Sequence, residues 1–368
     1  MLTKYFSFYK NIDWLMILPA LFLTGLGLVE IYSISLSRSG GDLSSFKKQL
    51  IFAAIGLTAM IFLTSIDFYL FYSYSNILYL IGAILLVAVL FFGSEINNTK
   101  GWFSIFGLGI QPVELVKFIL IVFLARYLSG ESTAQKPVRN SLITGIGAFV
   151  LVTLVMLQPD LGSAALLIFI WIYILFISGL PKRYFLVLMA IFCFIFVIAW
   201  NFFLVGYQKD RISSFISPGT TLTADYNVNQ AIIAVGAGGL NGRGLGFGSQ
   251  SQLKFLPEAQ TDFIFAVIAE ELGLVGVMLV IALFVLLFWR IFKNMANIKN
   301  DFGSFLVLGI GGLIFIEMFI NIGMNLGLSP VVGIALPFLS YGGSSLIVNL
   351  AMVGALQSVV VHSKIKQY

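Results

Sequence analysis

The feature of this sequence that most limits its fold is a series of apolar runs, each about as long as a membrane is thick. A helix needs about 20 mostly apolar residues to cross the hydrocarbon core of a bilayer. Ten runs meet this length, near residues 13–33, 48–66, 69–93, 111–129, 141–158, 160–179, 184–205, 262–290, 303–328 and 332–361. Because a spanning backbone must satisfy its own hydrogen bonds, we predict an all-α, multi-pass membrane protein that forms a single domain over residues 1–368.

The composition agrees with this prediction and argues against several classes of function. Charged residues make up 10% of the chain and hydrophobic residues 59%, whereas soluble domains are about 25% charged. The net charge of +5 comes from basic residues scattered over the loops, so we predict no nucleic-acid partner. The single cysteine, Cys193, and the single histidine, His362, exclude an internal disulfide and a thiolate metal cluster.

The basic residues also predict how the chain is oriented. Cytoplasmic segments of membrane proteins are enriched in lysine and arginine. With a cytoplasmic N-terminus, twelve of the 21 basic residues face the cytoplasm: Lys4, Lys10, Arg126, Lys136, Arg139, Lys182, Arg183, Arg290, Lys293, Lys299, Lys364 and Lys366. We therefore predict both termini inside and the long connection at 206–261 outside. A connection of that length is usually functional, so it is expected to contain a soluble or re-entrant substructure.

Acidic side chains collect at the outer starts of the fourth, sixth and eighth runs. Glu114 and Lys117 are three residues apart, which places them on one helical face within pairing distance. Asp160 and Asp262 stand where a carboxylate would interact favourably with a helix N-terminus. Two interpretations stay open for each group: a packing pair or helix cap, or the lining of a polar cavity.

Two further polar groups lie inside apolar runs. Glu317, Asn321 and Asn325 follow one another at a spacing of four and form one polar stripe along a helix. The stripe predicts either interhelical hydrogen bonds or the wall of a cavity. Glu270 and Glu271 lie two to three turns beyond Asp262, and we interpret them as packing or capping partners.

The segment Gly236–Gly248 contains seven glycines. Its spacing does not match a dinucleotide fingerprint, and no Gly-Lys-Ser/Thr follows, so we reject a nucleotide-binding loop. One remaining interpretation is a backbone that approaches an anion, such as a lipid-linked pyrophosphate, with Arg243 and Lys254 as counter-charges. The other is a tightly turning re-entrant loop.

The acids and bases on this one membrane face favour glycosyl transfer. The chain has no nucleophile–base pair, so acyl transfer is disfavoured. One carboxylate would take a proton from an attacking sugar hydroxyl. Cationic groups, or a metal held by carboxylates, would stabilise a departing pyrophosphate. A lipid flippase and a non-catalytic scaffold are the alternatives; a flippase would need polar groups along a path between both faces.

Four motifs resemble one known family over nearly the whole chain: Gln111–Glu114 with Lys117, Gln158–Gly162, Gly248–Gly273 and Pro337–Ser345. The chain resembles the SEDS family (shape, elongation, division and sporulation), and Ser249–Leu253 with Asn321–Met324 favour its elongation branch. The chain departs from the family pattern as we know it at Val113, Ser163 and Gln260.

The resemblance implies a bacterial cytoplasmic-membrane glycosyltransferase that polymerises lipid II at the outer face during cell elongation. It implies Asp262 as the catalytic carboxylate and a class B penicillin-binding transpeptidase as a partner, beside other membrane proteins of the elongation complex. It also implies a divalent cation, Mg²⁺ or Mn²⁺, for which we expect Asp160 and Asp262 as ligands, and no organic cofactor. The residues expected to bind substrate are Gln111, Glu114, Lys117, Asp160, Arg243, Lys254, Ser340, Gly342 and Gly343.

Overall fold

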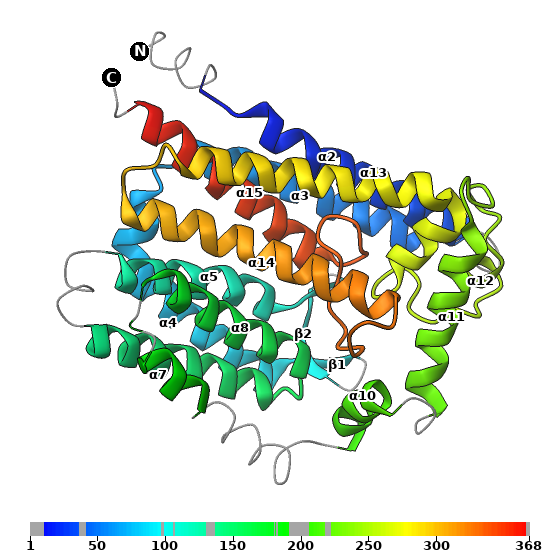
Figure 1. The fold of residues 1–368 in the computed structure, drawn as a ribbon, viewed down its shortest axis with the longest axis horizontal. Helices are drawn as coiled ribbons and strands as arrows, with labels where there is room; N and C mark the ends of the chain where they lie inside the picture. The colour runs from blue at the N-terminus through cyan, green and yellow to red at the C-terminus, as the bar shows by residue number, and fades with distance from the viewer. Residues whose placement is uncertain are drawn as a thin grey trace.

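The protein is a bundle of long helices that run roughly parallel to one another, seen along its side in Figure 1. The computed structural model describes residues 11–36, 42–96, 99–105, 107–129, 137–179, 181, 183–190, 206–217 and 222–365. Within these residues, seven helices are long and apolar enough to cross a membrane. The prediction of a helical, multi-pass membrane protein is confirmed.

Nine of the ten predicted spans appear as helices in the described part of the chain. They are α2 (Trp14–Leu36), α3 (Ser44–Ser65), α4 (Tyr69–Phe92), α5 (Pro112–Leu128), α7 (Pro137–Met156), α8 (Leu161–Ile177), α13 (Ile264–Met295), α14 (Asp301–Asn325) and α15 (Gly343–Ile365). Two of them, α5 and α8, have 17 residues each, the short limit for a spanning helix. The predicted span 184–205 lies mostly outside the described residues, so the total of ten stays a prediction.

The last apolar run, 332–361, contains Pro337 and the polar stretch Ser340–Ser345, which together predict that it is broken, and the structure confirms the break. Residues 326–342 have no helical structure, and α15 begins only at Gly343. Pro337 stands in the irregular part, where its missing N–H costs no helical hydrogen bond. The irregular segment lies at the end of the bundle beside the start of α13, and α15 then packs along α3.

A small sheet, which the all-α prediction did not include, connects α4 to α5. Strands β1 (Ser94–Ile96), β2 (Thr99–Ile105) and β3 (Leu108–Ile110) pair antiparallel in that order. Gly107 turns the chain between β2 and β3 with a φ of 77°. The sheet could not be predicted from the sequence, because its strands are too short to give a periodic pattern.

The connection 206–261 folds into helices rather than a structureless loop. It contains α10 (Gly206–Ile216), α11 (Leu222–Gly238) and the short α12 (Ser249–Gln252). The helix α11 packs against α13. Gly238 stands at their contact, where an added Cβ would lie 1.8 Å from the carbonyl oxygen of Ala269. A side chain there would push the two helices apart.

The glycine run docks onto an interruption in α13. Gly273 has a φ of 66° and a ψ of −161°, which breaks the helical hydrogen-bond ladder. The freed carbonyls of Glu270 and Glu271 accept hydrogen bonds from the backbone N–H groups of Arg243 (3.0 Å) and Gly244 (2.9 Å). The glycines therefore permit a close backbone approach to α13, which supports the interpretation as a tightly turning loop.

Both described ends of the chain lie at the same end of the bundle (Figure 1). Asp13 accepts a hydrogen bond from Arg290 (2.6 Å), and its backbone N–H donates to Gln357 (3.1 Å). The small sheet, α10 and α12 lie toward the opposite end.

Candidate functional site

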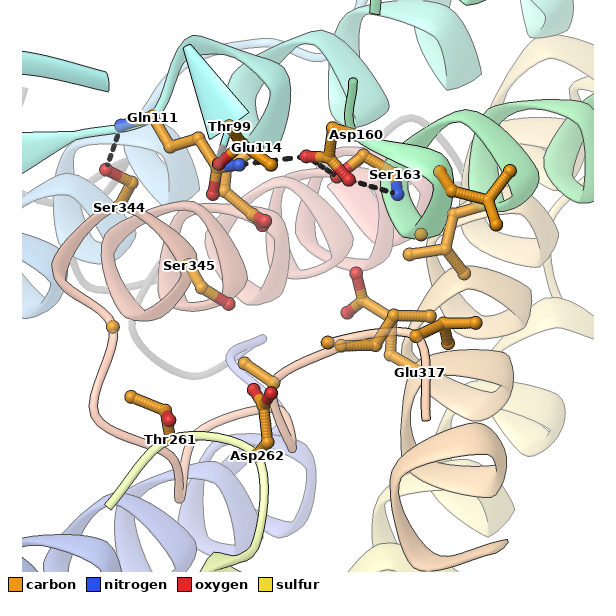
Figure 2. A pocket seen from close by; sticks show the side chains of 18 of the residues that line it. Thr99, Gln111, Glu114, Asp160, Ser163, Thr261, Asp262, Glu317, Ser344 and Ser345 are labelled. Carbon is orange, nitrogen blue, oxygen red and sulfur yellow. Dashed lines mark hydrogen bonds between the residues drawn. The ribbon is translucent and has the colours of Figure 1, made fainter. Parts of the chain in front are cut away.

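A polar cavity of about 190 Å³ opens between the small sheet, the starts of α5, α8 and α15, the turn before α13 and the irregular segment before α15. Its lining includes five carboxylates and two cations: Glu114, Asp160, Glu258, Asp262, Glu317, Lys117 and Arg211. Figure 2 shows Glu114, Asp160, Asp262 and Glu317 approaching the cavity from different elements. An excess of negative charge in so confined a space attracts cations or polar hydroxyl groups.

The predicted pair of Glu114 and Lys117 is present and has a third member. Pro112 begins α5, so both residues fall in its first turns, and Lys117 Nζ lies 2.8 Å from Glu114 Oε2. Lys117 Nζ also binds Glu317 Oε1, which comes from α14. The side chains of Lys117 and Glu317 are 4% and 3% exposed. The single ammonium therefore neutralises part of the charge of two nearly buried carboxylates.

Asp160 is both a helix cap and a wall of the cavity. Its side chain accepts hydrogen bonds from the backbone N–H of Ser163 (2.9 Å) and from Ser163 Oγ (2.8 Å), which caps α8. Gln111 Nε2 donates to the same carboxylate at 3.1 Å (Figure 2). The backbone N–H of Gln111 donates in turn to Ser344 Oγ at 2.7 Å, which ties α5 to α15.

Asp262 does not belong to the helix that follows it. The helix α13 begins at Ile264, so the alternative that Asp262 occupies its first turn is wrong. The turn is instead fixed by its backbone: the Asp262 carbonyl accepts hydrogen bonds from Asn321 and Asn325, each at 3.0 Å. These amides of α14 hold the turn while the carboxylate faces the cavity. The polar stripe thus supplies both interhelical hydrogen bonds and, through Glu317, a cavity wall.

The surroundings of Asp262 raise the pKa of its carboxyl to about 6. Burial is the main cause, because it disfavours the charged form, and the negative charge of Glu258 adds to it. The guanidinium of Arg211 opposes both effects. Asp262 is therefore a carboxylate whose protonation changes near neutral pH, as a general base requires.

The neighbouring segment 336–342 holds this turn from the side. Ser340 Oγ donates to the carbonyl of Thr261 (2.6 Å), and the backbone N–H of Tyr341 donates to the carbonyl of Gln260 (2.7 Å). Gly342 lines the cavity. Ser340 does not line it, and Gly343 packs against Phe52, whose ring would lie 2.4 Å from an added Cβ.

The two cations predicted from the glycine-rich segment lie outside this cavity. The exposed Arg243 donates to Ser249 Oγ at 2.7 Å, and Lys254 lines a second pocket beside Glu258 and Thr261. Arg211, from α10, lines the cavity together with Lys117 and acts electrostatically on Asp262. The sequence did not indicate this role for Arg211, because no periodic pattern in the connection 206–261 shows which of its basic residues faces the cavity.

The cavity lining contains two predicted metal ligands, Asp160 and Asp262, on opposite walls (Figure 2). Among the described residues, no three His, Cys, Asp or Glu side chains converge as metal ligands. The carboxylate of Asp160 already accepts hydrogen bonds from Ser163 and Gln111. The described residues therefore form no site made of protein ligands alone. One or two carboxylates are, however, the usual protein contribution where Mg²⁺ is shared with substrate phosphates.

The fold and the cavity define a multi-pass membrane protein with a carboxylate-lined site at one end of its helical bundle. Residues 13–365 match the family model described as cell cycle protein, which comprises FtsW, RodA and SpoVE. The chain belongs to this family, as the four motifs had indicated.

Two relatives match almost end to end. The chain is 37% identical over 349 residues to peptidoglycan glycosyltransferase MrdB of Escherichia coli (strain K12), covering 94% of each chain. It is 38% identical over 367 residues to stage V sporulation protein E of Bacillus subtilis (strain 168), covering 96% of this chain and 98% of the relative.

Solved structures agree with the fold. One is a chain from a structure described as the structural coordination of polymerization and crosslinking by a peptidoglycan synthase complex. It gives a TM-score of 0.79 at 29% identity, covering 96% of this chain and 98% of that one. The rod shape determining protein RodA of Thermus thermophilus gives a TM-score of 0.70 at 29% identity, covering 95% of this chain and 96% of that one.

Proposed function

We propose that this protein is a peptidoglycan glycosyltransferase that polymerises lipid II into glycan strands during cell elongation. The observation that carries the proposal is the position of Asp262, with a pKa near 6 and Arg211 beside it, in a polar cavity at one end of a membrane bundle. The relatives named peptidoglycan glycosyltransferases support the substrate class.

In this mechanism Asp262 takes the proton from the 4-hydroxyl of the acceptor sugar. The hydroxyl oxygen attacks the anomeric carbon of the donor, and the bond from that carbon to the lipid pyrophosphate breaks. The hydrogen bonds from Asn321 and Asn325 to the Asp262 backbone keep the base in place, so little reorganisation is needed at the moment of reaction.

The charge that develops on the leaving pyrophosphate needs cations. Arg211 is the cavity's arginine, and a guanidinium binds phosphate oxygens in a bidentate way. We assign it this role, while Lys117 stays engaged with Glu114 and Glu317. Arg243 and Lys254 are exposed. We assign them the role of attracting the anionic headgroup of the substrate as it approaches.

A divalent cation, Mg²⁺ or Mn²⁺, completes the proposal. Asp160 would hold it, and when bound it would neutralise charge on the leaving pyrophosphate. Asp262, the other expected ligand, must keep its carboxylate free to accept the proton of the acceptor hydroxyl. We expect chelation with EDTA to reduce polymerisation at least tenfold and added Mg²⁺ or Mn²⁺ to restore it. Ca²⁺, which prefers more ligands and longer distances, is the matched control. Full activity of the chelated enzyme would contradict this part of the proposal.

The protein would lie in the bacterial cytoplasmic membrane with both termini in the cytoplasm and the cavity outside. Two observations support this: the described ends lie together at one end of the bundle, and the cavity lies toward the other. The similarity to a chain of a peptidoglycan synthase complex, in which polymerization and crosslinking are coordinated, supports a class B penicillin-binding transpeptidase as the partner. We retain other elongation-complex membrane proteins as further partners.

Polymerisation in detergent tests the function most directly. The purified protein, with and without its transpeptidase partner, is mixed with lipid II, and the products are separated by length. We expect glycan strands. A lipid flippase would give no glycan strands, because in detergent there is no bilayer across which a lipid could be moved. A non-catalytic scaffold would give no glycan strands either, with or without the transpeptidase partner.

The pH dependence of this reaction should follow Asp262. A base acts in its ionised form, so the rate should rise with pH through about 6 and level off above it. Glu258→Gln removes a charge that raises the pKa, so the midpoint should shift down; Arg211→Gln removes a charge that lowers it, so the midpoint should shift up. Initial rates between pH 5 and 8 measure both shifts. A midpoint that neither variant moves would contradict the assignment.

A further inference from the structure

We propose that Glu30 carries a proton and donates a hydrogen bond to Glu271, and that this carboxyl–carboxylate bond positions the segment leading to the catalytic turn. The inference rests on the proposed function for its effect on activity, and on the structure alone for its effect on the segment.

Glu30 is a fully buried carboxyl group on α2. It has 0% of its surface exposed, and neither side-chain oxygen has a hydrogen-bond partner among the described residues. Ser33 lies three residues further along, on the same face of the helix. Its Oγ donates to Glu271 Oε2 at 2.7 Å. Because α2 packs against α13, Glu30 lies beside the same carboxylate and interacts with it electrostatically.

Glu271 is the acceptor of the two acids. Besides the hydroxyl of Ser33, it accepts hydrogen bonds from the backbone N–H of Gly246 (3.0 Å) and from Gln252 Nε2 (2.7 Å). The hydroxyl of Ser251 is a fourth, longer donor at 3.4 Å, and such a set of donors stabilises an ionised carboxylate. A second ionised carboxylate beside it, fully buried and without a donor among the described residues, would carry a large desolvation cost and would repel the first. A proton on Glu30 removes both costs and supplies one more donor to Glu271.

The hydrogen bond from Glu30 to Glu271 affects the segment 243–252, because Glu271 holds this segment against α13. Its neighbour Glu270 binds the same segment through the backbone N–H groups of Gln250 (2.8 Å) and Ser251 (3.1 Å). The chain then continues directly into the turn that carries Glu258 and Asp262. Loss of the proton donor would leave Glu271 facing an unsatisfied or charged neighbour and would loosen this segment. Glu30 is therefore a positioning residue, which acts on the turn through Glu271.

Three substitutions on one helix separate the possible roles of Glu30. Glu30→Gln keeps a hydrogen-bond donor without a titratable group, whereas Glu30→Met keeps the volume and removes the donor. Thr24→Val is the matched control, because Thr24 is also buried on α2 and its hydroxyl donates only to its own helix, at Ala20 (2.8 Å).

Two measurements are made on each purified full-length variant. The first is kcat and KM for lipid II polymerisation. The second is the rate of tryptic cleavage after Arg243 and Lys254, two exposed sites within and just beyond the segment, followed by mass spectrometry. We expect Glu30→Gln and Thr24→Val to stay within twofold of the wild type in both. Glu30→Met should lower kcat at least tenfold with little change in KM, and should raise cleavage at least tenfold.

Two outcomes overturn the inference. If Glu30→Gln is as impaired as Glu30→Met, an ionised carboxylate is required there rather than a donor. If Glu30→Met behaves as the wild type, Glu30 only fills space. If the methionine variant does not fold, Glu30→Leu repeats the test, and failure of both apolar variants beside a fully active Glu30→Gln supports the bond. A wild-type protein that does not polymerise lipid II rejects the proposed function, and cleavage alone then decides the inference.

Discussion

Asp262→Asn should reduce lipid II polymerisation by about 10²- to 10⁴-fold, the usual contribution of a positioned general base. Asparagine keeps the size of the side chain but cannot accept the proton of the acceptor hydroxyl. The hydrogen bonds of Asn321 and Asn325 reach the backbone carbonyl of residue 262, so the substitution leaves the turn in place. Rates are measured with purified protein in detergent above pH 7, where the wild type has reached its plateau.

The matched control is Glu258→Gln, which removes a negative charge from the same cavity lining. We expect this variant to keep polymerisation within about fivefold of the wild type, because its carboxylate affects Asp262 only electrostatically. Size-exclusion profiles and co-purification with the transpeptidase partner show whether both variants are folded. A folded Asp262→Asn variant that retains a tenth or more of the activity would disprove the catalytic assignment.

The second large effect is expected on stability. Lys117→Met removes the ammonium that lies between Glu114 and Glu317, whose side chains are 13% and 3% exposed. Removing one member of a buried ionic group leaves uncompensated charge, which costs about 3–5 kcal/mol. Two carboxylates are left here instead of one, so we expect a cost at the upper end of that range. The loss is measured as a lower midpoint of thermal unfolding in detergent and as poor recovery of monodisperse protein.

A charge-free triple variant is the control for this prediction. Glu114→Gln, Lys117→Met and Glu317→Gln together remove all three charges and keep similar volumes. Buried ionic groups replaced as a set often cost little, so the triple variant should regain most of the wild-type midpoint. If Lys117→Met alone is as stable as the wild type, the three residues do not form a strongly coupled group, and the cavity is wetter than its burial indicates.

Much of the architecture follows from local properties of the sequence. A spanning helix is a run of about 20 apolar residues, and hydropathy can be evaluated run by run without knowledge of the fold. Nine predicted spans in the described residues follow from this alone. The break before α15 follows from Pro337 and the polar stretch Ser340–Ser345, which are also local features. The small sheet does not follow from hydropathy. Its strands have three, seven and three residues, which is too short for a periodic pattern.

The site was only partly predictable. Glu114 and Lys117 are three residues apart, and helical geometry suffices to pair them. Glu317 is 200 residues from Lys117 in sequence, and nothing local indicates that they meet. Arg211 reaches the cavity through the packing of the connection 206–261, and it lines the cavity where Arg243 and Lys254 were expected. Such long-range contacts depend on which helices pack together.

The sequence by itself determined that this chain spans a membrane many times, that its acids gather at one face, and that it resembles one family. These conclusions rest on hydropathy, spacing and motifs, which are properties of short segments. Only the tertiary structure decided that Asp262 is a cavity carboxylate rather than a helix cap, and that the glycine run docks on α13. The reason is physical: the protonation of a carboxylate and the need for a glycine depend on the atoms around them, and those come from distant parts of the chain.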